Sequence, residues 1–252
     1  MSKYQAIIFD LDGTAIPNSA TGMPSPRLID VVARNKDRIH LIAASGREIS
    51  YASPVIKALD LIDPCIIAGG TVILDPKTLL AIKKTNIPQA ALEPLITYGH
   101  QSRYGVFLRD EQVLPGSPIP LRDDIEIIYL DQIPKAEVLT AKHAVDSIPG
   151  VTGSVVPDWE NKDSVYCLNV TNKHATKQHA VTAVLELLGV PKAASIGIGD
   201  GDNDLHLFSS VGLRIAMGNA QPLLKKAADV IAPSIDEDGL ADVIEKYALQ
   251  VT

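Results

Sequence analysis

Residues 6–16 read AIIFDLDGTAI, an apolar run that ends in two aspartates, Asp10 and Asp12, with only Leu11 between them. An uninterrupted apolar run is typical of a strand buried on both faces of a parallel sheet. Two carboxylates this close repel each other, so the pair requires a cation, a shared proton or full solvation. A solvated turn rich in Asp and Gly would also explain the pair. The residues at the ends of the other expected strands are needed to choose between these explanations.

Apolar runs and amphipathic stretches alternate on both sides of this segment. The alternation predicts strands separated by helices, and therefore a Rossmann-like, doubly wound and mostly parallel α/β sheet. The expected strands are residues 6–10, 39–45, 64–70, 194–200 and 213–219, and a short apolar stretch, 230–234, precedes the last helix. The expected helices are residues 25–37, 47–60, 175–189, 203–212, 221–229 and 239–249.

The pattern changes between about residues 88 and 163 to helix, strand, strand, helix, strand, strand. The segments are 89–101, 103–109, 124–130, 135–148, 151–160 and 164–170. Two helices on a small antiparallel sheet form a separate α+β unit. We therefore expect a discontinuous core of residues 1–84 and 165–252, with a smaller α+β domain of residues 85–164 inserted into it.

The composition limits the class of partner. A net charge of −7 without a run of basic residues, and an aromatic content of 4%, argue against nucleic acid or an anionic membrane as the main partner. Cys65 and Cys167 lie far apart and predict neither a zinc site nor a disulfide framework. No signal peptide or long apolar segment is evident, so we expect a cytoplasmic protein.

A second acidic group, GDGDND at residues 199–204, follows another expected strand. Ligands bind at the carboxyl ends of parallel strands. We therefore expect Asp200 and Asp204 to meet Asp10 and Asp12, and the group to hold a hard divalent cation through oxygen atoms.

Two other interpretations of GDGDND fail on spacing. A calcium-binding loop requires a glycine and a glutamate at the positions of Leu205 and Val211. A dinucleotide-binding fingerprint requires its third glycine at the position of Asp202.

Two further residues lie where expected helices begin. Ser45 forms a capping-box pattern with Glu48. A serine hydroxyl there either caps the helix or binds phosphate, and the sequence leaves both possibilities open. Lys177 lies in the first turn of a helix, where its charge gains nothing from the helix dipole. It is either a solvated surface lysine or the partner of an anion.

In this order, the motifs resemble those of the haloacid dehalogenase superfamily of phosphotransferases, and most closely its Cof-type phosphatases. The first motif, D-x-D-G-T, runs from Asp10 to Thr14, and the second is Ser45 with Gly46 and Arg47. The third is a lysine that opens a helix, Lys177. The fourth, G-D-G-x-N-D, is residues 199–204, followed by AMGNA at residues 216–220.

The resemblance implies a Mg²⁺-dependent phosphomonoester hydrolase. Asp10 would be the nucleophile that forms an aspartyl-phosphate, and Asp12 the general acid and base. Asp10, the backbone carbonyl of Asp12 and Asp200 would hold Mg²⁺, with Asp204 supporting them from outside the direct ligands. The expected phosphate-binding residues are Ser45, Gly46, Lys177 and Asn203.

The insert would be a cap similar in size to those of phosphoglycolate, sucrose-phosphate and mannosyl-phosphoglycerate phosphatases, and its contacts would select the substrate. The implied substrate is a small phosphorylated metabolite, such as a sugar phosphate or phosphoglycolate. Arg103, Arg109 and Arg122 would meet a substrate carboxylate or remain solvated. We expect a monomer or homodimer. A phosphosugar mutase and a non-catalytic metabolite-binding protein on the same fold remain alternatives.

The chain departs from the family pattern at two places. Residues 68–71 read AGGT where Cof-type members usually have Ser-Asn-Gly-Ala, so Gly69 replaces an asparagine. Gln178 follows Lys177 where glycine is usual, which leaves Lys173 as a second candidate for the third motif.

Overall fold

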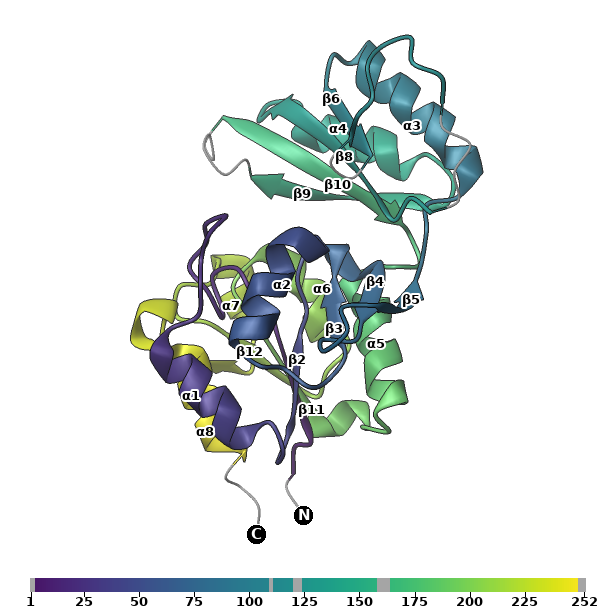
Figure 1. Cartoon of the computed structure of the whole chain (residues 1–252). Coiled ribbons are helices and arrows are strands. Elements are labelled where there is room, and N and C mark those ends of the chain that lie inside the picture. Colours follow the sequence, from purple (N-terminus) through teal and green to yellow (C-terminus); the bar gives the residue numbers. More distant parts are fainter. Residues whose placement is uncertain (1–2, 109–110, 120–123, 158–163, 249–252) are drawn as a thin grey trace. The chain divides into compact units, whose positions relative to one another are not determined.

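The computed structural model describes residues 3–108, 111–119, 124–157 and 164–248 (Figure 1). The chain divides into two compact units, Met1–Lys83 with Lys177–Thr252 as the first and Lys84–Thr176 as the second. The sequence assigned residues 165–176 to the core. They belong to the second unit instead, because β10 (Val165–Asn172) lies between two strands of that unit's sheet. Arg109 and Arg122 lie outside the described residues.

The described part of the first unit contains a five-stranded parallel sheet with the order β13-β12-β11-β1-β2. All four residues of β1 are buried, as the uninterrupted apolar run predicts. β1 pairs with β2 on one side and β11 on the other, so Asp10 follows an inner strand. The strands are β1 (Ala6–Phe9), β2 (His40–Ala43), β11 (Ser195–Gly199), β12 (Leu213–Ala216) and β13 (Val230–Ile231).

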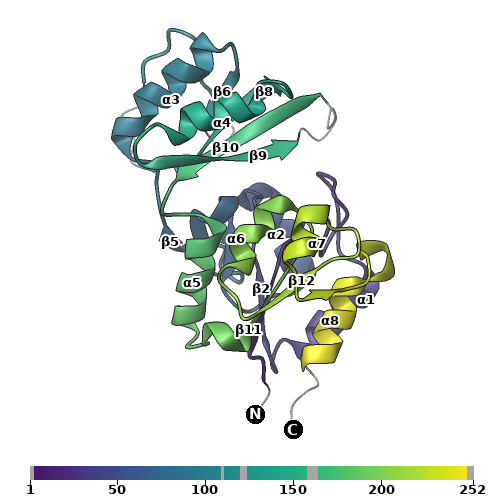
Figure 2. The same ribbon diagram turned by 180° about the vertical axis from the view of Figure 1, so that it is seen from behind.

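Helices cover both faces of this sheet (Figures 1 and 2). They are α1 (Pro26–Asn35), α2 (Ile49–Ala58), α5 (Lys177–Leu187), α6 (Leu205–Phe208), α7 (Pro222–Ala227) and α8 (Gly239–Ala248). Successive side chains of a strand point to opposite faces. Ile7 and Phe9 share a core cluster with residues of α1, α2 and α8, whereas Ile8 shares one with residues of α5 and α6. The predicted doubly wound α/β core is confirmed.

A second, three-stranded sheet contains β3 (Cys65–Ile67), β4 (Val72–Leu74) and β5 (Ala81–Lys84). Ile66 in β3 forms an isolated parallel bridge with Ala44, directly after β2. The N–H of Ser45 donates to the carbonyl of Ile66 at 2.9 Å. These contacts keep the chain extended through Ser45, beyond the end of β2.

The second unit is an antiparallel sheet with helices α3 (Gln89–Gln101) and α4 (Val138–Asp146). Leu130 and Leu168 are cross-strand partners and share a core cluster with residues of both helices. The predicted α+β character of the inserted unit is confirmed. The strand order is β7-β6-β8-β10-β9, with β6 (Gly105–Leu108), β7 (Glu111–Gln112), β8 (Ile127–Pro134) and β9 (Val151–Pro157).

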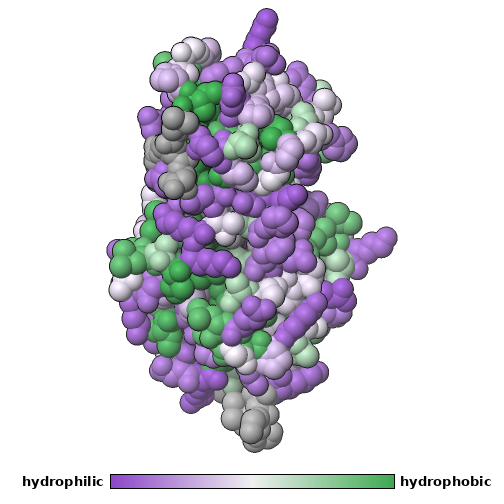
Figure 3. Space-filling view, turned by 90° about the vertical axis from the view of Figure 1, so that its right-hand side faces the viewer, coloured by the Kyte–Doolittle hydropathy of each residue, from purple (hydrophilic) through white to green (hydrophobic). Residues whose placement is uncertain are grey.

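Hydrophilic residues cover most of the face shown in Figure 3, and hydrophobic residues lie among them in small groups. Among the described residues, no helix has both the length and the apolar character that a membrane span requires.

Candidate active site

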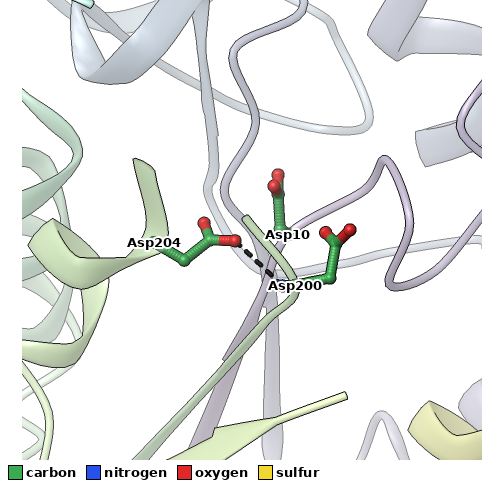
Figure 4. A group of neighbouring side chains, drawn as sticks. All are labelled: Asp10, Asp200 and Asp204. Atoms are coloured by element: carbon green, nitrogen blue, oxygen red, sulfur yellow. Dashed lines mark hydrogen bonds between the residues drawn. The ribbon is translucent and has the colours of Figure 1, made fainter. Parts of the chain in front are cut away.

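Asp10, Asp200 and Asp204 converge at the carboxyl ends of β1 and β11 (Figure 4). One carboxylate oxygen of each lies within 4.8 Å of the other two. Asp10 follows β1 and Asp200 follows β11, and paired parallel strands end at the same edge of a sheet. Asp204 ends a 3₁₀ turn, Asp202–Asp204, that leads into α6. The two acidic groups that the sequence singled out therefore meet in space.

Lys177 is buried among these acids. Its Nζ lies 3.0 Å from Oδ1 of Asp10 and 2.8 Å from Oδ1 of Asp204. Lys177 is the first residue of α5, where the helix dipole disfavours a positive charge. The two carboxylates explain why a lysine stands there. Lys177 makes these contacts, whereas the other candidate for the third motif, Lys173, is exposed.

Asp204 is fully buried and holds its neighbours through both oxygens. Its Oδ1 accepts from Lys177, and its Oδ2 accepts the N–H of Asp200 at 3.1 Å and that of Gly201 at 3.2 Å. The carboxylates of Asp10 and Asp200 instead point away from the strand ends toward the same side (Figure 4). Asp204 therefore supports the other two acids.

Burial and mutual repulsion alter the proton affinities of the cluster. Burial, reinforced by the charge of Asp204, raises the pKa of Asp200 to about 7. The same two causes raise the pKa of Asp10 well above its ordinary value, against the opposing attraction of Lys177. Burial favours the neutral amine of Lys177, but Asp10 and Asp204 outweigh it and raise the pKa of Lys177 above its ordinary value.

The donor set fits a hard divalent cation such as Mg²⁺. Carboxylate oxygens are its preferred protein ligands, and in octahedral coordination opposite ligands stand about 4 Å apart. Oxygens of Asp10, Asp200 and Asp204 all lie within 4.8 Å of one another, so Asp10 and Asp200 are close enough to share one ion, with Asp204 beside them. Three buried or half-buried acids with one buried lysine also leave an excess of negative charge that a cation would neutralise.

We expect the metal-free protein to lose stability as the pH rises from about 4 to about 7. Asp200 ionises near 3.8 in the unfolded chain but only near 7 in the folded protein, so the unfolded state releases its proton earlier. The free energy of unfolding then falls by at most about 1.4 kcal/mol per pH unit for this group. The raised pKa of Asp10 acts in the same direction.

Thermal unfolding in a chelator across this pH range measures the effect. Asp200→Asn should show a shallower decline than the parent protein, because the asparagine has no proton to release. Equal slopes for the two proteins would contradict this prediction.

Asp12 forms a bidentate pair with Arg47, which is itself buried. Nε of Arg47 donates to Oδ2 of Asp12 at 2.8 Å, and Nη2 donates to Oδ1 at 2.6 Å. Arg47 also donates to the carbonyls of Ser19 and Tyr51. The sequence identified Arg47 only as a neighbour of Ser45 and missed this pairing. Each oxygen of Asp12 accepts one hydrogen bond from Arg47 and keeps a second lone pair that could take a proton.

Ser45 is buried, but it does not cap α2. Within the described residues the helix begins at Ile49 with Glu48 as its N-cap, and no side chain caps it. The capping-box interpretation is therefore wrong, because the helix begins four residues after Ser45 and its N-cap position is Glu48. The hydroxyl of Ser45 accepts the N–H of Arg47 at 3.1 Å instead. The next residue, Gly46, borders open space.

Three other residues belong to motifs that the sequence singled out or to its departures from the family pattern. Asn203 is exposed on the turn that carries Asp204. The hydroxyl of Thr14 donates a long hydrogen bond of 3.4 Å to Oδ1 of Asp200. Gly69 has a φ of 68°, a left-handed conformation that glycine and asparagine adopt more readily than other residues. The backbone at this position therefore accepts the glycine of this chain as well as the asparagine usual in Cof-type members, although the glycine lacks the asparagine side chain.

Comparison with known families now places the chain. A family model described as haloacid dehalogenase-like hydrolase matches residues 7–129 and 160–244. The chain belongs to this family. It is a phosphatase of the haloacid dehalogenase superfamily, as the motifs predicted.

Individual relatives match nearly the whole chain. A phosphoglycolate phosphatase of Methanopyrus kandleri is 26% identical over 247 residues, which cover 97% of this chain and 97% of the relative. A haloacid dehalogenase-like hydrolase of Bacteroides thetaiotaomicron has a solved structure similar in fold, with a TM-score of 0.76 and 22% identity, covering 96% of this chain and 99% of that one. The structure of a sugar phosphatase of subclass IIB also has a TM-score of 0.76 and 22% identity, covering 96% and 98%.

Proposed function

We propose that this protein is a Mg²⁺-dependent hydrolase of small phosphomonoesters that acts through an aspartyl-phosphate on Asp10. The observation that carries the proposal is the buried arrangement of Asp10, Lys177 and Asp200 where β1 and β11 end. A carboxylate at this position has a lysine at 3.0 Å and a second carboxylate beside it. Asp10 as the nucleophile, Lys177 as the compensating charge and Asp200 as a metal ligand would then be neighbours.

The surroundings of Asp10 assign different tasks to its two oxygens. Oδ1 accepts the N–H of Leu11 at 2.8 Å and faces Lys177, whereas no donor from the described residues contacts Oδ2. Oδ2 is then the atom that attacks phosphorus. As the new oxygen–phosphorus bond forms, the bond from phosphorus to the leaving alkoxide breaks. When bound, Mg²⁺ would neutralise phosphoryl charge and keep Asp10 ionised, held by Asp10, Asp200 and the backbone carbonyl of Asp12.

Asp12 would move the proton in both halves of the reaction. It protonates the departing alkoxide, and it then accepts a proton from the water that attacks the phosphorus of the aspartyl-phosphate. That attack releases phosphate and restores Asp10. The bidentate contact with Arg47 orients the carboxylate of Asp12 and leaves one lone pair on each oxygen for the proton. Ser45, Gly46, Lys177 and Asn203 would bind the phosphate.

The proposed substrate is a small phosphorylated metabolite, either a sugar phosphate or phosphoglycolate. The phosphoglycolate phosphatase of Methanopyrus kandleri supports the second choice, and the subclass IIB sugar phosphatase the first. A cytoplasmic location, a monomeric or homodimeric state, and the absence of nucleic acid and membrane partners stay predictions from the sequence.

Phosphate release from a panel of sugar phosphates and phosphoglycolate tests the proposal. We expect turnover of at least one ester with Mg²⁺ and none with a chelator. Chromatography of the products separates hydrolysis from a mutase reaction, which would yield an isomeric ester instead of free phosphate. Binding of an ester without any turnover would indicate a metabolite-binding protein and contradict the proposal.

A further inference from the structure

Asn219, in the AMGNA stretch, joins two distant backbone segments through its side-chain amide. Its Nδ2 donates to the carbonyl of Gly13 at 2.8 Å, and its Oδ1 accepts the N–H of Ile235 at 2.9 Å. A carbonyl only accepts and an N–H only donates, so these partners fix the orientation of the amide. One side chain thus ties the loop after β1 to the segment after β13.

The turn that carries Asn219 is itself held on two sides. It follows β12, which is separated from β1 by β11 in the sheet. The N–H of Met217 donates to the carbonyl of Gly199 at 2.9 Å, and the N–H of Gly218 donates to that of Pro233 at 3.2 Å. The turn is therefore anchored to the end of β11 and to the segment after β13. Its asparagine reaches across the end of β11 to the loop after β1.

Gly13, the residue that Asn219 holds, packs so closely against Asp200 that a side chain at this position would have no room. It has a φ of +71°, and a Cβ in its place would lie 2.1 Å from Oδ2 of Asp200. Its N–H donates to the carbonyl of Ile16 at 2.8 Å. Peptide units are planar, so this bond holds the plane before Gly13, and Asn219 holds the plane after it. The plane before Gly13, which the bond to Ile16 holds, also carries the backbone carbonyl of Asp12, and a trans peptide directs that carbonyl away from Ile16.

We propose that Asn219 is a positioning residue that holds the Asp10–Thr14 loop against Asp200. The inference rests on the proposed function, in which the carbonyl of Asp12 and the carboxylates of Asp10 and Asp200 hold Mg²⁺. These groups come from two separate loops, which meet where Gly13 and Thr14 lie against Asp200. Without the amide, the peptide plane after Gly13 loses its tether to the rest of the fold. The metal ligands are then less well ordered, and metal affinity falls.

Asn219→Ala tests this inference, and the chain offers a matched control. In the second unit, Nδ2 of Asn172 donates to the carbonyl of Asn86 at 2.9 Å, and its Oδ1 accepts the N–H of His174 at 2.9 Å. Asn172→Ala therefore removes the same two kinds of hydrogen bond far from the acids in sequence. Calorimetric titration with Mg²⁺ alone, without substrate, measures the affinity of the parent and both variants.

We expect Asn219→Ala to weaken Mg²⁺ binding about 10-fold or more, the usual effect of removing a group that orients metal ligands. Asn172→Ala should bind Mg²⁺ as the parent does. Phosphate release by Asn219→Ala should also recover as the Mg²⁺ concentration increases, which a loss of folded protein would not produce. Should Asn219→Ala fail to fold, Asn219→Ser provides the same measurement with a smaller loss of polarity.

Parent-like Mg²⁺ affinity in a folded Asn219 variant would overturn the inference, as would an equal loss in Asn172→Ala. A parent protein that binds Mg²⁺ but hydrolyses no ester would contradict the proposed function, while the titration would still decide the role of Asn219. A parent that binds no Mg²⁺ would overturn both.

Discussion

Asp10→Asn is expected to lower Mg²⁺-dependent phosphate release by at least about 10³-fold, because an uncharged amide cannot replace a carboxylate nucleophile. The variant should fold, since asparagine has the same shape and keeps an oxygen that accepts the N–H of Leu11. Phosphate release under saturating Mg²⁺ measures the loss. Asp37→Asn, which removes an exposed carboxylate elsewhere in the first unit, is the matched control and should retain parent activity.

The same variant should stabilise the metal-free protein above neutral pH. Burial and the charge of Asp204 raise the pKa of Asp10, so its ionised form is unfavourable in the fold even with Lys177 beside it. Asparagine carries no charge and avoids this penalty, and Lys177 keeps Asp204 as a partner. Thermal unfolding in a chelator should therefore give a higher Tm for Asp10→Asn than for the parent.

Phosphate release by Asp10→Asn at the rate of the parent protein would exclude Asp10 as the nucleophile.

The strands and the acids at their ends were predictable because each depends on a local pattern. β1 is an uninterrupted apolar run, and in a parallel sheet such a run ends where ligands bind. The meeting of Asp10 with Asp200 follows from that rule once both segments are recognised as strands. Lys177 was noticed because its charge is misplaced at the start of a helix.

The contacts that orient these acids were not predictable in the same way. Arg47 and Asp12 are 35 positions apart, and Asn219 and Gly13 are 206 positions apart. Such pairs depend on how the turns that follow different strands meet in space. The hydrophobic periodicity of either segment carries no information about this meeting. The capping-box pattern at Ser45 failed because helix α2 begins only at Ile49, after a segment whose first residue pairs with Ile66. The sequence pattern counted residues 164–170 as the last strand of the insert, and only the predicted boundary at residue 165 separated β10 from β8 and β9, with which it pairs.

Lys177→Met is expected to reduce both stability and activity, because it removes the cation between two buried carboxylates. Nζ lies 3.0 Å from Asp10 and 2.8 Å from Asp204, and the exposed fractions of the three side chains are 5%, 7% and 0% in the order Lys177, Asp10, Asp204. Removing one partner from such a buried arrangement destabilises proteins by about 3–5 kcal/mol. Chemical denaturation in a chelator at neutral pH measures the loss. Lys173→Met is the matched control, since that lysine is exposed.

The expected loss depends on conditions in a way that distinguishes charge compensation from packing. Methionine fills much of the volume of the lysine side chain, so a packing defect would be similar at every pH and Mg²⁺ concentration. Unpaired carboxylates instead regain stability when they are protonated or when a cation approaches them. Lys177→Met should therefore be less destabilised at about pH 5 than at about pH 8, and less with Mg²⁺ than without it. A loss that is the same under all these conditions would mean that Lys177 stabilises the site through its packing and not through its charge.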